Sequence, residues 1–518
     1  MNRYDFSTDG LRLYNTNQVT FPPMPTVDRL AQSGVTFRNA YAYPTCSPTR
    51  CSILTGRYGF RTGIGYALAN PAGPHLGANE FTIPKAMTAA NPNLRHGLVG
   101  KWHLSFKAPD PNTLGGFSDF SGGILGELSA YNDWPKKVTN GVEITSGFAP
   151  NPVPHRSYTN YATTDNLKDA TNWISAQGTN SWFLWLAFNA CHEPFHLPPT
   201  NLALHSYAYL SGAQSDINTN GRPYYEAMAQ SLDTCVSNLL DFLGPQTNLT
   251  TVIFMGDNGT PKSVIQLPYT TNQCKGTLYE GGIRVPLIIA GPKVKGANRS
   301  TDAVVSTVDL YATILELAGI NLAATLPTDL VFDSQSFLPI LTDTNYVPPE
   351  HYVLAENFNA NLPDELAGRA VRNRQFKLIL FNNGVQEMYD LLSDPYEHSN
   401  LLSGWLTLPQ QTNYVALINK LGEWQVLPSP VVTAYAKQSD RFAVTATHSS
   451  GASCWLVRND QLDYPVWTAL TNVNTVRLSS TTTRIADTNM PAPSAFYRFA
   501  LRPVQASTNA STGWKDWD

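Results

Sequence analysis

The chain contains 518 residues, of which 42% are hydrophobic, and it carries a formal net charge of −4 at pH 7. A chain of this length exceeds what one hydrophobic core usually supports, so two or three domains are expected. The low net charge provides no overall basic field, which argues against a general affinity for nucleic acids or anionic membranes.

Neither a membrane span nor an export signal is visible in the sequence. The longest apolar run, residues 182–188 (WFLWLAF), is far shorter than the roughly 20 residues that a helix needs to cross a bilayer. The opening residues, MNRYDFSTDG, lack the basic start and the apolar run of a secretory signal.

Between about residue 26 and residue 424, helix-like segments alternate with short apolar strands. This pattern predicts an α/β fold with a central mixed sheet flanked by helices. Residues 27–33 (VDRLAQS) predict an amphipathic helix that ends at Gly34. Buried strands are predicted at residues 98–101, 182–188, 251–255 and 285–290. Each of these strands runs into a loop with polar residues or glycine, and such loops commonly carry functional residues.

Beyond a main α/β domain at residues 1–345, the sequence predicts two smaller domains. Residues 346–427 predict an α+β subdomain with alternating strands and a helix at 414–421. Residues 428–504 are rich in Ser, Thr, Val and Asn, and their short alternating runs predict a β-sandwich-like module. The last residues, 505–518, predict a flexible tail.

The six cysteines contain no CxxC pair and form no dense framework for a protein of this size. A zinc site and a disulfide scaffold are therefore not expected. Taken alone, Cys46 and Cys51 are compatible with a disulfide bridge or with two free buried thiols.

The residues most informative about function lie in a few short motifs. The pentapeptide Cys46-Ser47-Pro48-Thr49-Arg50 is followed at once by LTGR at residues 54–57. Further along come Gly100-Lys101-Trp102-His103, His192 in the string CHEPFH, Asp257-Asn258 in MGDNG, and Lys275 in CKGTLYEGGIRVP. Together these motifs resemble the formylglycine-dependent (type I) sulfatases of the alkaline phosphatase superfamily, whose maturation enzyme reads a CxPxR core followed by LTGR.

The resemblance implies an alkaline-phosphatase-like fold and an enzyme that hydrolyses sulfuric esters. It implies that a formylglycine-generating enzyme oxidises Cys46 to formylglycine. One hydroxyl of the aldehyde hydrate would attack sulfur, and the other would later expel sulfate. Arg50 would hold the formylglycine hydroxyl and the loop around it.

The same resemblance assigns roles to the other motif residues, and these roles match the needs of sulfate-ester hydrolysis for positive charge and for an acid. Lys101 would bind a sulfate oxygen and formylglycine, and His103 would contact a formylglycine hydroxyl and assist elimination. His192 would protonate the leaving oxygen, and Lys275 would pair with the sulfate group.

A divalent cation is also implied by the resemblance. Its ligands would be Asp257, Asn258 and Cys46 in its formylglycine form. Two hard oxygen ligands beside an anionic substrate suit Ca²⁺, with Mg²⁺ as the alternative.

The chain departs from the family pattern at its start. Sulfatases normally begin with an apolar strand that ends in two adjacent metal-binding aspartates, and this sequence shows neither feature. Asp5 and Asp9 are the only early acids, and no apolar strand precedes them. The simplest interpretation is that Met1 is an internal methionine and that a signal peptide, the first strand and the aspartate pair lie upstream. The protein is then expected to be an active enzyme, periplasmic or secreted.

Two other functions stay open at this point. One is a phosphatase or phosphodiesterase of the same superfamily, against which Cys46 argues because those enzymes usually have Ser or Thr as nucleophile. The other is a non-catalytic glycan-binding protein that keeps the fold, which the missing aspartate pair favours and the intact motifs oppose.

The organic part of the substrate cannot be read from the motifs. The appended β-rich module and the inferred export favour a sulfated polysaccharide over small aryl sulfates. Tyr66, Trp102, Trp134 and Phe195 are candidates to line a sugar-binding pocket, and each is equally compatible with a place in the core.

Overall fold

The structure is a computed structural model that describes residues 21–144, 160–203, 207 and 209–424. It also describes strand segments at residues 431–438, 441–447, 453–459, 468–469, 473–479, 482–487 and 496–502. Asp5, Asp9 and the expected tail at 505–518 lie outside the described residues. Among those residues, no helix is long and apolar enough to cross a membrane. The chain divides into two compact units, Met1–Leu362 and Pro363–Asp518, which are described one at a time.

The first sheet of the N-terminal unit has four strands in the order β7-β8-β1-β9. These strands are β1 (Gly34–Tyr41), β7 (Val252–Met255), β8 (Leu287–Ala290) and β9 (Arg299–Ser306). Strand β1 runs parallel to β9 and antiparallel to β8, and β7 is antiparallel to β8. Both directions occur in one sheet, which makes the sheet mixed.

The second sheet of this unit has five strands in the order β5-β4-β3-β2-β6. These strands are β2 (Arg95–Lys101), β3 (Asp119–Gly123), β4 (Lys136–Val138), β5 (Val142–Ile144) and β6 (Trp182–Ala187). Strand β2 is parallel to β3 and β6, whereas β4 is antiparallel to β3 and β5. The second sheet is therefore mixed as well.

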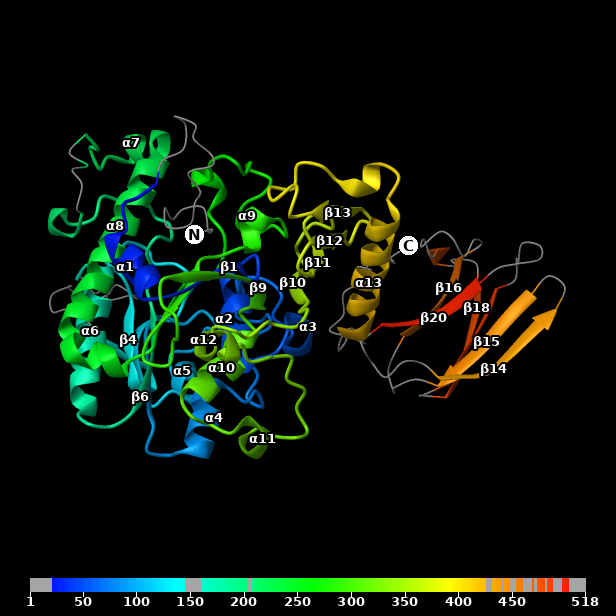
Figure 1. Cartoon of the computed structure of the whole chain (residues 1–518), viewed down its shortest axis with the longest axis horizontal. Coiled ribbons are helices and arrows are strands. Elements are labelled where there is room, and N and C mark those ends of the chain that lie inside the picture. Colours follow the sequence, from blue (N-terminus) through cyan, green and yellow to red (C-terminus); the bar gives the residue numbers. More distant parts are fainter. Residues whose placement is uncertain are drawn as a thin grey trace. The chain divides into compact units, whose positions relative to one another are not determined.

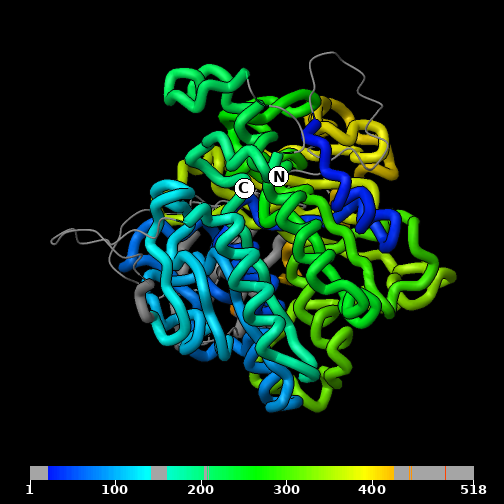
Figure 2. Tube along the Cα trace, turned by 90° about the vertical axis from the view of Figure 1, so that its left-hand side faces the viewer, coloured from blue at the N-terminus to red at the C-terminus, as the bar shows by residue number. Residues whose placement is uncertain are grey.

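Helices surround these sheets, as the α/β prediction requires. The α-helices of the N-terminal unit are α1 (Pro25–Ser33), α2 (Cys46–Thr55), α3 (Gly59–Thr62), α4 (Ile83–Ala90), α5 (Asp110–Thr113), α6 (Ala162–Gln177), α7 (Gln214–Thr219), α8 (Gly221–Leu243), α9 (Glu280–Ile283), α10 (Asp309–Leu317), α11 (Leu322–Thr325) and α12 (Leu338–Thr342). Helices α1 and α6 pack against α8 (Figure 1). The view turned by 90° follows the same chain as a tube, in which the long green α8 can be traced (Figure 2). Helix α10 packs against α2 and α4.

Among the described residues, three apolar clusters contribute to the core of this unit. One lies around α1 and α8, a second between the first sheet and α10, and a third around α2, β2 and β3. Helix α1 is also fixed by a remote carboxylate, because Asp233 accepts hydrogen bonds from the backbone N–H groups of Thr26 and Val27 at 3.1 and 2.9 Å. Those N–H groups have no partner inside a helix, so Asp233 on α8 performs the role of a cap.

The elements predicted from periodicity are confirmed, with shifted ends. Helix α1 ends where predicted, before Gly34, while β2 begins at Arg95, earlier than the predicted Leu98. The strands differ from the prediction in one respect, because they form two sheets instead of one central sheet. Strands β6 and β7 are each the outer strand of their sheet, and most of their apolar side chains are half-buried, whereas those of β8 are fully buried.

The C-terminal unit contains β11 (Gly368–Arg372), β12 (Phe376–Phe381) and β13 (Gln386–Asp390). Strand β12 pairs antiparallel with both β11 and β13. Helix α13 (Leu408–Trp424) packs on β11 and β12, and it is longer than the predicted helix at 414–421. The N-terminal unit ends with β10 (Val353–Asn357).

The C-terminal unit contains seven further described strands beyond residue 428, where the sequence predicts a β-rich module. They are β14 (Val431–Gln438), β15 (Arg441–Thr447), β16 (Ser453–Asn459), β17 (Thr468–Ala469), β18 (Val473–Ser479), β19 (Thr482–Asp487) and β20 (Phe496–Arg502). They form two sheets, β14-β15-β19-β18 and β17-β16-β20. We retain the domain boundaries after residues 345, 427 and 504 as a proposal.

Candidate active site

The predicted site residues lie at the ends of strands and at the start of one helix. Cys46 is the first residue of α2, and Lys101 is the last residue of β2. His192 lies in the loop after β6, and Asp257 in the loop after β7. Helix α2 is buried along its whole length and ends at Gly56, whose φ of 66° is the left-handed conformation that glycine adopts without strain. The site is therefore built on rigid, buried elements.

Cys46 and His103 are in direct contact. The Cys46 Sγ atom lies 3.0 Å from Nδ1 of His103, and Nε2 of the same ring lies 3.0 Å from the carbonyl oxygen of Leu68. Because a carbonyl oxygen can only accept, Nε2 carries a proton and donates it to Leu68. Nδ1 is then the nitrogen that exchanges a proton with the group at position 46.

The surroundings of Cys46 favour a negative charge. Burial by itself would raise the pKa of its thiol, but the positive charges of Lys101, His103 and Lys275 and the hydrogen bond with His103 lower this pKa to about 5. Its place at the start of α2 adds the partial positive charge of a helix N-terminus. An anionic group at position 46 is thus stabilised from several directions.

Cys51 provides a contrast on the same helix. It is fully buried among apolar side chains, and this burial raises the pKa of its thiol to about 12. Both Cys46 and Cys51 are free thiols, so the disulfide that the sequence left open is not formed. Only Cys46 has the surroundings of a reactive group.

Arg50 connects three parts of the site. Its guanidinium donates to the Lys101 carbonyl oxygen at 2.8 Å and to Oδ2 of Asp257 at 3.1 Å. The Arg50 side chain is buried, so water competes little with its ion pair to Asp257. Arg50 therefore holds α2, the end of β2 and the loop after β7 together.

Positive charge dominates around the Arg50–Asp257 pair. Burial and the nearby Arg50 lower the pKa of Lys101, while the Cys46 thiolate opposes this effect. Burial would raise the pKa of the Asp257 carboxyl, yet Arg50, Lys101 and Lys275 hold it well below its usual range. Asp257 is thus a carboxylate surrounded by cations.

His192 lies within reach of the same charges. Burial, Lys275 and Lys101, in that order, lower the pKa of its imidazole to about 3. Its Nδ1 lies 2.9 Å from the carbonyl oxygen of Glu193, so Nδ1 carries the proton of the neutral ring. At neutral pH His192 is therefore uncharged, and it must gain a proton before it can act as the acid that the sequence comparison implies.

The residues implied as cation ligands fit a divalent cation poorly. Asp257 is already paired with Arg50, and the neighbouring side chains Lys101 and Lys275 are cationic. Within the described ranges, no group of three or more His, Cys, Asp and Glu side chains is placed to hold a metal ion. Ca²⁺ and Mg²⁺ need more negative oxygen ligands than one carboxylate and the Asn258 amide supply. These residues by themselves do not form the implied site.

The structure also reveals a residue that the motifs did not indicate. A Cβ atom on Gly126 would lie 2.3 Å from Cε1 of His103, so only glycine fits beside this ring. His103 itself has a φ of 53°, a left-handed conformation that is uncommon outside glycine. The close packing of Gly126 helps to hold His103 in place. A single glycine in a loop gives no signal in the sequence that would have identified it.

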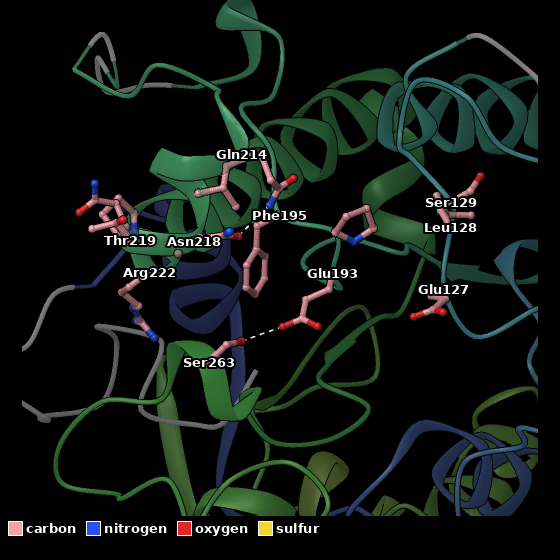
Figure 3. Close-up of a pocket in the computed structure, with 15 residues that line it drawn as sticks. Glu127, Leu128, Ser129, Glu193, Phe195, Gln214, Asn218, Thr219, Arg222 and Ser263 are labelled. Carbon is pink, nitrogen blue, oxygen red and sulfur yellow. Dashed lines mark hydrogen bonds between the residues drawn. The ribbon is translucent and has the colours of Figure 1, made fainter.

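The four aromatic candidates separate into two groups. Trp102 and Trp134 are buried in the apolar clusters, which excludes them from a sugar-binding surface. Tyr66 is half-buried near position 46, where burial and the Cys46 charge raise its pKa. Phe195 lines a cavity of about 830 Å³ together with residues of the loops at 127–129 and 263 and of helices α7 and α8 (Figure 3).

Large parts of the chain resemble known proteins. A family model described as sulfatase matches residues 5–320, and one described as N-sulphoglucosamine sulphohydrolase, C-terminal, matches residues 273–421. Arylsulfatase J of Mus musculus is 30% identical over 302 residues, covering 57% of this chain and 48% of the mouse protein. The chain therefore spans about half the length of that relative.

Two further matches cover more of the chain. A sulfatase of Formosa agariphila is 26% identical over 497 residues, covering 80% of this chain and 86% of that protein. The crystal structure of Ps i-CgsB in complex with k-i-k-neocarrahexaose superposes with a TM-score of 0.64 at 23% identity, covering 79% of this chain and 88% of that one. The structural match confirms the predicted fold.

Proposed function

The chain belongs to the sulfatase family, and from this premise we propose that it hydrolyses the sulfate ester of a sulfated carbohydrate. The observation that carries the proposal is the setting of Cys46, whose sulfur lies 3.0 Å from His103 and in the field of Lys101 and Lys275. Formylglycine at position 46, hydrated by one water molecule, would supply one hydroxyl to attack sulfur and a second that allows sulfate to be expelled as the aldehyde re-forms. Its formation requires a formylglycine-generating enzyme as partner.

The residues around position 46 have distinct tasks in this proposal. Lys101 and Lys275 attract the sulfate group and stabilise the charge that develops on its oxygens. His103 accepts a proton through Nδ1, while the bond from Nε2 to Leu68 fixes the ring. Arg50 positions Lys101 and Asp257 through its two hydrogen bonds.

His192 delivers a proton to the leaving oxygen. In the free protein its pKa of about 3 leaves it neutral. A bound sulfate ester places negative charge among Lys101, Lys275 and His192, which offsets the two lysines and raises the His192 pKa. Substrate binding thereby charges the acid that the reaction needs. The steps above are assigned to side chains alone, because Asp257 and Asn258 by themselves supply too few negative oxygen ligands for the Ca²⁺ or Mg²⁺ that the resemblance implies.

A carbohydrate substrate is supported by the relatives. The solved neighbour Ps i-CgsB holds an oligosaccharide, and the β-rich module suits a protein that acts on polysaccharides. A periplasmic or secreted location belongs to the same proposal, and fractionation of the native host with antibodies against the chain tests it.

The proposal is tested by co-expressing the chain with a formylglycine-generating enzyme and analysing the tryptic peptide NAYAYPTCSPTR, residues 39–50, by mass spectrometry. We expect the aldehyde in place of the thiol, together with sulfate release from an aryl sulfate or from sulfated sugars, assayed with and without added Ca²⁺. The Cys46→Ala variant should release none. An unmodified thiol, under conditions that convert a known sulfatase, would refute the proposed maturation. A modified chain that binds sulfated sugars without hydrolysing them would support the glycan-binding alternative.

A further inference from the structure

The cavity lined by Phe195 is formed by segments that adjoin candidate active-site residues in the chain. Residues 193–195 follow His192 in the chain, and Gly126, which touches His103, precedes the lining residues Glu127 and Ser129. Ser263, on the loop that starts with Asp257, donates a hydrogen bond of 2.7 Å to Oε1 of Glu193 (Figure 3). Two walls of the cavity are thus continuations of segments that carry catalytic candidates, and a third continues the segment that touches His103.

The lining of the cavity is chemically suited to a sugar. Its polar side chains include amides and hydroxyls, namely Gln214, Asn218, Asn220, Ser129, Thr219 and Ser263. The Asn218 amide oxygen accepts from Nε2 of Gln214 at 2.8 Å, which orients the amide and directs its NH₂ group as a donor. The volume of about 830 Å³ lies within the range of roughly 300–1,000 Å³ typical of ligand sites.

Phe195 supplies the apolar surface of the cavity. It is half-buried, and its ring meets Tyr225 edge to face with centroids 6.1 Å apart and an interplanar angle of 83°. This contact restrains the ring, and the part of its surface that lines the cavity can take the C–H face of a sugar. Polar groups around a fixed aromatic ring match a ligand with hydroxyls on its rim and carbon on its faces.

The charges of the lining distinguish between classes of sugar. Among the described residues that line it, Arg222 is the one cationic side chain, and Arg222 is paired with Glu226 at 2.8 Å and donates to the Val264 carbonyl oxygen at 3.1 Å. The acidic side chains Glu127 and Glu193 both line the cavity. The cavity therefore has a negative balance, in contrast to the cationic surroundings of position 46, and a second anionic group would be repelled there.

From this contrast we propose that the cavity binds an uncharged sugar unit next to the sulfated one. The substrate class is then a sulfated oligosaccharide whose neighbouring unit carries neither sulfate nor carboxylate. This inference rests on the proposed function, because it assumes that the sulfate group of the same substrate is bound at position 46.

The test compares two disaccharides that share one sulfated unit and differ in the second, which is galactose in one and glucuronate in the other. Both are titrated calorimetrically into the Cys46→Ala chain, so that binding is measured without turnover. We expect the galactose form to bind about tenfold or more tightly than the glucuronate form. Asn218→Ala should weaken the galactose form by roughly three- to tenfold through the loss of a hydrogen-bond donor. Glu127→Gln should reduce the difference in affinity between the galactose and glucuronate forms, because it removes one negative charge from the cavity.

Ser215→Ala serves as the matched control, because Ser215 is exposed on the same helix as Asn218 and does not line the cavity. It should leave both affinities unchanged. Equal affinity for the two disaccharides, or tighter binding of the glucuronate form, would overturn the inference, as would an Asn218→Ala variant that binds like the control. Failure of the proposed function gives a different result, because the unmutated, formylglycine-bearing chain would then hydrolyse neither disaccharide nor an aryl sulfate, whatever the binding data show.

Discussion

His192 shows how strongly the charges of neighbouring residues govern a single side chain. Its position after β6 agrees with the proton donor expected from the motif, but its pKa of about 3 is too low for a donor at neutral pH. Burial is the first cause of this low pKa, and the lysines at 275 and 101 add to it. The charge state of His192 is thus set by whether an anion sits between it and these lysines.

We predict that sulfate or a sulfated sugar raises the His192 pKa, because the anion offsets the lysine charges that keep the ring neutral. The titration of the ring is followed by NMR in the Cys46→Ala chain, with and without ligand. Lys275→Met should also raise the pKa in the ligand-free protein, since it removes a positive charge. An unchanged titration with bound ligand would exclude His192 as a proton donor charged by substrate binding.

Gly126 has no side chain, and its close packing fixes the position of the His103 ring. We predict that Gly126→Ala displaces the His103 ring, because the added Cβ would lie 2.3 Å from Cε1. A displacement of this kind should lower kcat/KM for sulfate-ester hydrolysis by about 100-fold. Gly123→Ala is the matched control, since its Cβ would lie at an ordinary 3.5 Å from Leu128. Equal activity of the two variants would show that the position of His103 does not depend on Gly126.

At the scale of elements, β12 carries a charged residue in the core of the C-terminal unit. Lys377 on this buried strand pairs with Glu397 at 2.7 Å, and both side chains are 0% exposed. Glu397 lies within a turn in which the Asp394 carboxylate accepts from the backbone N–H groups of His398 and Ser399 at 3.0 and 2.8 Å. The turn therefore places the partner that makes a buried lysine tolerable on β12.

We predict that Glu397→Gln lowers the free energy of unfolding of the C-terminal unit by roughly 3–5 kcal/mol, because it removes the carboxylate charge that pairs with the buried Lys377 ammonium group. Urea unfolding of the full chain measures the change. Glu423→Gln is the control, because its pair with Lys420 is exposed and should contribute less than about 1 kcal/mol. A loss as small as that of the control would mean that solvent reaches Lys377.

At the scale of the whole molecule, the β-rich module pairs its strands within itself. In the described segments from residue 431 onward, β14, β15, β18 and β19 form one sheet and β16, β17 and β20 another. We predict that a chain ending at residue 427 unfolds at the same temperature as the corresponding part of the full chain. Its calorimetric scan should lack one transition that the full chain shows. A single transition at a much lower temperature in the shortened chain would contradict the proposed boundary.

Short-range features of the sequence determined much of this protein. The apolar runs determined the positions of β2, β6, β7 and β8, because burial and strand formation depend on neighbouring residues. The spacing of the motifs around Cys46, Lys101 and Lys275 was sufficient to identify the family. The same local reasoning could not separate Trp102, which is in the core, from Phe195, which lines the cavity, because both are aromatic residues near strand ends.

Only the tertiary structure decided the charge state and the fine geometry of the site. The Arg50–Asp257 pair joins residues 207 positions apart, and Gly126 reaches His103 from a different strand end. The pKa values of Cys46 and His192 reflect burial and the charges of Lys101, at the end of β2, and Lys275, in a loop far along the chain. Electrostatic interactions and steric contacts depend on distances in space. The sequence therefore names the residues that take part, but only the folded structure shows which of them are close enough to act on one another.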